Sequence, residues 1–291
     1  MSTIPTLGSE LRGSYADESA RIQSDFATSG DGRAAIFSRA TIVESILLRL
    51  WTQHISAEKN RPDGLALVAL GGFGRRWLFP HSDIDLLFLH ANDRAETEFK
   101  DRIRRFSQEV WDLRMKLSPA TRKLSECDRF DPDNLEFTVS LLDSRYLGGD
   151  PSLFAQLQDG ALPKLLARER KIFSQRLADL TRTRHAKFGD TVFHLEPNVK
   201  DGPGGLRDYN VASWLNTISA YGRNRLATEE GPPSARQRSR LALDFLMSAR
   251  CFLHYLHKRD NNALTWESQD EAAVLAADLS ACLRQRPRRS D

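Results

Sequence analysis

The sequence predicts an α+β protein in which short strands come first and a helical region follows. Two apolar runs, residues 65–70 and 84–89, contain β-branched or aromatic residues and are bounded by Gly and Pro, which favours buried strands, although periodicity alone does not exclude short buried helices. From Asp150 onward the pattern is helical, with turns that contain Gly and Pro between the ranges 152–187, 208–222 and 235–258. We therefore expect one domain over residues 31–149 and a helical domain over residues 150–279.

The remaining elements are predicted from apolar spacing. Residues 33–55 and 93–110 carry apolar side chains at steps of three and four, which indicates amphipathic helices. Residues 111–117 alternate between apolar and polar at a period of two, which predicts a strand with Asp112 on its polar face. Residues 1–30 have few apolar anchors and are expected to form a loosely ordered leader, and residues 280–291 to form a disordered basic tail.

Composition narrows the class of protein. The net charge of +3 is a weak argument for a nucleic-acid partner, and we expect none. The three cysteines are far apart and lack any C-x-x-C spacing, so neither a disulfide framework nor a zinc site is indicated. No stretch of eighteen apolar residues occurs and the first residues do not resemble a signal peptide. These features predict a cytoplasmic protein without a membrane segment.

A glycine turn and an acid pair form the first chemical motif. Gly71-Gly72 follows the first apolar run, and Asp83-Ile84-Asp85 opens the second. Side chains alternate along a strand, so the two carboxylates are expected on one face, where they can bind Mg²⁺, with Mn²⁺ as an alternative. The glycines let backbone N–H groups approach phosphates. The spacing fits neither a Walker A motif nor a dinucleotide fingerprint.

A second glycine turn, Gly202-Pro203-Gly204-Gly205, stands between Lys200 and Arg207. A cation on each side of such a turn suits a triphosphate, and arginine can bind phosphate oxygens with two parallel hydrogen bonds. The alternative is an ordinary loop at the start of a helix, with Asp208 as its cap.

These motifs resemble a known family. Gly-Gly followed about ten residues later by Asp-h-Asp-h, where h is apolar, resembles the signature of the DNA polymerase β-type nucleotidyltransferase superfamily. The longer strings GGFGRRWLFPHSDIDLLFL and LEPNVKDGPGGLRDYNVASW, together with a weaker match over residues 253–273, are similar to the bacterial PII uridylyltransferase/uridylyl-removing enzymes. The resemblance spans roughly residues 30–275 and implies a polymerase β-like core, a small mixed sheet with helices, followed by a helical domain.

The resemblance also implies an activity. Members of this family transfer UMP from UTP to a tyrosine hydroxyl of the signalling protein PII, in a Mg²⁺-dependent reaction. Carried over to this chain, the metal-binding and catalytic acids would be Asp83, Asp85 and Asp112, with Asp143 as the next candidate for the third acid. The nucleotide-binding residues would be Gly71, Gly72, Arg75, Ser82, Lys200 and Arg207.

The chain also departs from the family pattern. Residues 118–121 read Ser-Pro-Ala-Thr where relatives have Gly-His-Ser-Val, and Arg76-Trp77 replace Gly-Glu. No His-Asp dipeptide occurs, so we expect neither the uridylyl-removing nor the glutamine-sensing domain of the family. Two alternatives stay open: an adenylyltransferase of related fold, and a catalytically silent truncated fragment.

Overall fold

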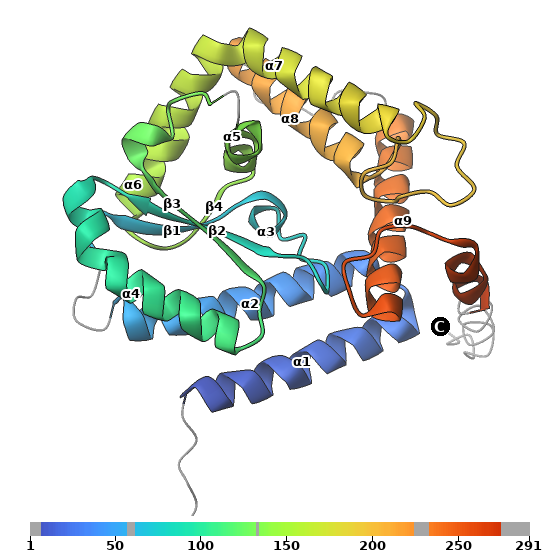
Figure 1. Cartoon of the computed structure of the whole chain (residues 1–291), viewed down its shortest axis with the longest axis horizontal. Helices are drawn as coiled ribbons and strands as arrows, with labels where there is room; N and C mark the ends of the chain where they lie inside the picture. Colours follow the sequence, from blue (N-terminus) through green and yellow to red (C-terminus); the bar gives the residue numbers. More distant parts are fainter. Residues whose placement is uncertain (1–6, 57–61, 132–133, 224–232, 275–291) are drawn as a thin grey trace, which may run out of the picture.

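The computed structural model of the chain describes residues 7–56, 62–131, 134–223 and 233–274 (Figure 1). Its sheet contains β1 (Leu65–Ala69), β2 (Ile84–His90), β3 (Leu117–Lys123) and β4 (Arg145–Gly149). The helices that precede β4 in the chain are α1 (Leu7–Ser29), α2 (Gly32–His54), α3 (Gly71–Gly74), α4 (Asp93–Asp112), a 3₁₀ turn (Leu124–Glu126) and α5 (Leu135–Leu142). The later helices are α6 (Pro151–Ala155), a π-helical segment (Gln156–Ala161), α7 (Leu162–Ala186), α8 (Leu206–Arg223) and α9 (Pro233–His257). The α+β class predicted from the sequence is confirmed.

The sheet is small and mixed, with strand order β3-β2-β1-β4. β1 is antiparallel to both β2 and β4, whereas β3 runs parallel to β2. A parallel pair needs a crossover connection, and α4 provides it. β3 contains Pro119, which an edge strand tolerates because one side of its backbone has no ladder partner.

Different helices cover the two faces of the sheet (Figure 1). On one face, Leu67 and Phe88 share a core with residues of α2 and α4. On the other face, Val68 and Leu87 share a core with residues of α5, α6, α7 and α8, including Trp214. The helices after residue 150 thus bury the second face of the sheet, and the division into two domains at this residue stays a prediction.

Helix α9 closes one side of the molecule (Figure 1). Its buried Met247 and Cys251 pack with Ile36 of α2, with Phe79 from the segment before β2, and with Leu206 at the start of α8. This third core brings the β1–β2 connection, the second glycine turn and α9 together, although they are far apart in the sequence.

The prediction of a loosely ordered leader was wrong for most of its length, since residues 7–29 form α1. Leu11 and Ile22 are buried, and Tyr15 and Phe26 pack partly against the same cores. These four side chains lie on one helical face, so few apolar residues suffice once α2 is available to pack against. The predicted basic tail lies outside the described residues.

The prediction of a strand over residues 111–117 was also wrong. Trp111 and Asp112 end α4, Arg114 adopts φ 60°, and β3 begins at Leu117. A short period-two pattern arises here because Leu113 and Met115 are buried where the chain leaves the helix and turns back to the sheet. No helix in the described ranges is long and apolar enough to cross a membrane.

Candidate active site

The first glycine turn lies between β1 and β2, where α3 makes a single helical turn. Gly71 adopts φ 50°, and a Cβ on it would lie 3.4 Å from Oδ2 of Asp85. A Cβ on Gly74 would clash with the carbonyl oxygen of Asp143. Glycine at these two positions lets the turn approach both the acid pair and the segment before β4.

Asp83 and Asp85 both line a cavity of about 180 Å³, while Ile84 and Leu86 between and after them are buried in the core. This is the arrangement that strand alternation predicts. Burial raises the pKa of Asp85 to about 6, and the neighbouring charge of Asp83 adds to the shift, against opposing contributions from Ser118, Lys200 and Arg75. The acid pair therefore carries negative charge that the protein itself does not fully compensate.

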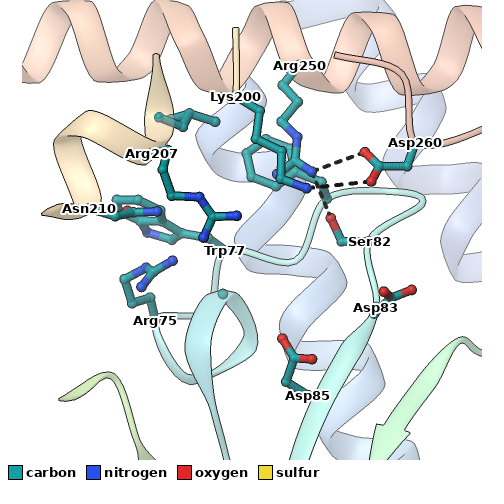
Figure 2. A pocket seen from close by; sticks show the side chains of 13 residues that line it. Arg75, Trp77, Ser82, Asp83, Asp85, Lys200, Arg207, Asn210, Arg250 and Asp260 are labelled. Carbon is teal, nitrogen blue, oxygen red and sulfur yellow. Dashed lines mark hydrogen bonds and ion pairs between the residues drawn. The ribbon is translucent and has the colours of Figure 1, made fainter. Parts of the chain in front are cut away.

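The cavity gathers residues from three distant segments (Figure 2). Besides the acid pair it is lined by Gly72, Arg75, Trp77, Phe79, Ser82, Lys200, Leu206, Arg207, Asn210, Arg250 and Asp260. Every residue that the sequence predicted for nucleotide binding lies here, except Gly71, which does not line the cavity. Figure 2 shows the two acids on one side and most of the cations on the other.

Arg75 is held from several directions. Its guanidinium forms an ion pair with Asp143 and lies over the rings of Trp77 and Trp214, at 5.1 and 5.9 Å from their centroids. Nε1 of Trp214 also donates a 2.8 Å hydrogen bond to Asp143. Burial lowers the pKa of Arg75 and raises that of Asp143. Asp143, the second candidate for the third acid, is thus a positioning residue for Arg75.

The second glycine turn brings its two flanking cations together. The N–H of Arg207 donates to the carbonyl oxygen of Lys200 at 2.8 Å, which fixes the two residues at one mouth of the turn. Asp208 does accept a hydrogen bond from the N–H of Gly204, at 2.7 Å, but its carboxylate also binds Arg184 and His185 of α7. The turn is therefore tied to α7 as well as to α8.

Arg250 and Asp260 are site residues that sequence reasoning missed. The Arg250 guanidinium lies 4.1 Å from the ring centroid of Phe79, and its Nη2 lies 3.4 Å from Oγ of Ser82 and 3.2 Å from Asp260. Arg250 stands in the C-terminal half of α9, and its local sequence resembles that of any amphipathic helix. The only signal was the weak family resemblance that begins three residues later.

The structure does not bring Asp112 to this cavity. Asp112 is exposed at the end of α4, where its carboxylate accepts a 3.0 Å hydrogen bond from Gln108. The β3 residue that pairs with Asp85 in the sheet register is Ser118. The proposed third acid is therefore corrected: in β3 a serine, not a carboxylate, stands beside the acid pair.

The acid pair by itself suits Mg²⁺. Among the described residues no cluster of three or more His, Cys, Asp or Glu side chains forms a metal site. Mg²⁺, however, is usually bound by one or two carboxylates together with substrate phosphates. The two oxygen-bearing side chains of Asp83 and Asp85, which lack a full counter-charge and face a cavity rich in cations, fit that mode of binding.

Comparison with known proteins finds a family model and relatives that this chain resembles. A family model described as GlnD PII-uridylyltransferase matches residues 171–281. A bifunctional uridylyltransferase/uridylyl-removing enzyme from Pseudomonas entomophila (strain L48) is 35% identical over 252 residues, which are 84% of this chain and 27% of that protein. Proteins of the same name from Rhodospirillum rubrum and Azospirillum brasilense are 32% identical over 91% of this chain and 29% of their own length.

The chain thus spans a little over a quarter of the length of these relatives. Their matches cover both the acid pair with its glycine turn and the helices that supply the cations, since they extend over more than four fifths of the chain. The sequence motifs, the site and these comparisons agree: residues 171–281 match the PII-uridylyltransferase family model, and most of the chain is similar to part of these relatives.

Proposed function

We propose that this chain is a Mg²⁺-dependent nucleotidyltransferase that transfers UMP from UTP to a tyrosine hydroxyl of a PII protein. The observation that carries the proposal is the meeting of an incompletely compensated acid pair, a glycine turn and four cations in one cavity. The names of the relatives, which include uridylyltransferase, support the choice of nucleotide.

Each group has a defined task in this proposal. Asp83 and Asp85 would hold Mg²⁺, which when bound supplies positive charge next to the phosphates. The backbone of Gly71 and Gly72 and the hydroxyl of Ser82 would bind phosphate oxygens. The cations of the cavity would orient the triphosphate: Arg75, Lys200, Arg207 and Arg250.

The reaction needs no covalent enzyme intermediate. The tyrosine oxygen forms a bond to the α-phosphorus, the bond from this phosphorus to pyrophosphate breaks, and the hydroxyl releases its proton to water. Positioning and charge neutralisation by the cavity residues account for catalysis of such a displacement.

The buried, unpaired Cys127 and Cys251 suit a reducing compartment, and we place the reaction in the cytoplasm.

The test is transfer of label from [α-³²P]UTP to a PII protein in the presence of Mg²⁺, with unlabelled ATP, CTP and UTP as competitors. We expect labelled PII, and UTP as the strongest competitor. The control is the same protein with Asp83→Asn and Asp85→Asn. No transfer to an acceptor that a known uridylyltransferase does label would contradict the proposal, and stronger competition by ATP would favour the adenylyltransferase alternative.

A further inference from the structure

Two cations of the cavity share one carboxylate. Oδ1 of Asp260 lies 3.2 Å from Nη2 of Arg250, and its Oδ2 lies 3.6 Å from Nζ of Lys200 (Figure 2). Nε2 of His254 is 3.0 Å from the same Oδ1. Although burial opposes it, the charges of Lys200 and Arg250 lower the pKa of Asp260 to about 2. An anion thus already occupies the cationic side of the site.

Arg250 has other anchors besides this carboxylate. Its side chain is 8% exposed, its guanidinium lies over Phe79, and its Nε donates a 2.7 Å hydrogen bond to Oδ1 of Asn262. The Asp260 side chain, by contrast, is 37% exposed. Arg250 is therefore held by two other groups. The Asp260 carboxylate also accepts a 3.0 Å hydrogen bond from Nδ2 of Asn262, but it is exposed enough to turn toward water.

The backbone around Asp260 is fixed, so only its side chain needs to move. The N–H of Val199 donates to the carbonyl oxygen of Asn262 at 2.8 Å, and the N–H of Leu264 donates to that of Pro197 at 2.9 Å. These bonds hold the segment after Asp260 against the segment that leads into Lys200. Rotation of the carboxylate would expose both cations to a ligand without a change in the chain path.

We propose that Asp260 takes the place of a phosphate group when no nucleotide is bound, and that the polyphosphate of the nucleotide displaces it from Lys200 and Arg250. This inference rests on the proposed function, and it makes Asp260 a residue that sets affinity. A nucleotide must compete with an internal anion, so Asp260 weakens the binding of UTP and favours the release of pyrophosphate. Removal of its charge should therefore tighten binding.

The experiment measures binding of inorganic tripolyphosphate and of UTP, each with Mg²⁺, by titration calorimetry. We expect Asp260→Asn to bind both about tenfold more tightly than the wild type, because one nearby negative charge is lost. The matched control is Asp244→Asn, which removes a carboxylate that pairs with Arg33 outside the cavity and should leave both affinities unchanged. Unchanged or weaker binding by Asp260→Asn would overturn the inference.

Asp260→Ser serves as a second variant that also removes the charge, for use if the asparagine variant does not fold. The same gain in affinity is expected, and its absence in the folded variant counts against the inference. The two proposals fail differently. A wild type that binds neither probe contradicts the proposed function, whereas a wild type that binds both without a gain in either variant contradicts only the role of Asp260.

Discussion

The two sides of the cavity differ in whether their charged side chains are paired with opposite charges. On the sheet side, burial raises the pKa of Asp85 to about 6, and the neighbouring charge of Asp83 adds to the shift. On the helical side, Arg250 and Lys200 share Asp260 as a partner. The protein thus neutralises its cations internally but leaves its carboxylates without a full counter-charge.

This difference indicates which kind of ligand each side of the cavity suits. A group of like charges held in a partly buried site is unfavourable in the free protein and becomes favourable when a cation binds. Paired cations keep the helical side stable before a nucleotide arrives, at the expense of some affinity. We therefore expect substitutions on the sheet side to separate activity from stability, and substitutions on the helical side to change nucleotide affinity.

The largest effect should come from the acid pair. Asp83→Asn combined with Asp85→Asn keeps side-chain volume and removes both charges, so uridylyl transfer should fall on the order of 1000-fold while the fold persists. Initial rates of label transfer and circular dichroism spectra measure the two properties. Retention of more than about a tenth of the wild-type rate would contradict the role of these acids.

On the helical side, Lys200→Ala and Arg207→Ala should each weaken triphosphate binding. The loss of one charge-assisted contact of about 1.5–3 kcal/mol corresponds to roughly 10- to 150-fold in Kd. Titration calorimetry with UTP and Mg²⁺ measures it, and Arg182→Ala, which changes an exposed arginine of α7, is the control. A lower melting temperature with unchanged Kd would mean that the second glycine turn is structural.

Asp85 should make the folding stability of the protein depend on pH. Its raised pKa means that the folded protein binds this proton more tightly than the unfolded chain, so folding stability falls as pH rises from about 4 through about 6. Without Mg²⁺, Asp85→Asn should raise the melting temperature at pH 8 by roughly 2–6 °C and by much less at pH 4. Thermal unfolding at the two pH values tests this. An equal shift in melting temperature at both pH values, or no shift at either, would show that the pKa of Asp85 is not raised in the free protein.

The smallest effect is expected at Asp112. Because this exposed carboxylate contacts Gln108 at the end of α4, Asp112→Asn should change the transfer rate less than about twofold and leave the melting temperature within about 1 °C. The rate assay used for the acid pair measures it. A large loss of activity in a folded variant would restore Asp112 as a catalytic acid and would require a different arrangement of α4.

Sequence reasoning succeeded wherever residues that act together also lie close along the chain. The placement of Asp83 and Asp85 on one strand face follows from the two-residue period of a strand, and Gly71 is a turn residue in any fold that continues into that strand. The helices over residues 33–55 and 93–110 match α2 and α4 for the same reason, since their apolar spacing is local.

Where the pattern was short or met other elements, tertiary packing decided the outcome. Residues 7–29 are helical because α2 offers a surface for their few apolar side chains, and the alternation over residues 111–117 reflects the exit from α4, not a strand. The prediction that Asp112 lies at the site depended on this incorrect strand. β3 itself begins where the predicted strand would have ended.

The sequence by itself determined the acid pair, the two glycine turns and the cations beside them, because spacing within one turn or strand fixes which side chains share a face. Only the tertiary structure decided that Arg250 and Asp260 complete the cavity and that Asp143 holds Arg75. The Arg75–Asp143 ion pair joins residues 68 positions apart, and the contact of Arg250 with Ser82 joins residues 168 positions apart. Both exist because α8 and α9 pack against the sheet and its loops. Local apolar spacing does not predict contacts between residues so far apart, because such contacts depend on the burial of several apolar faces at once.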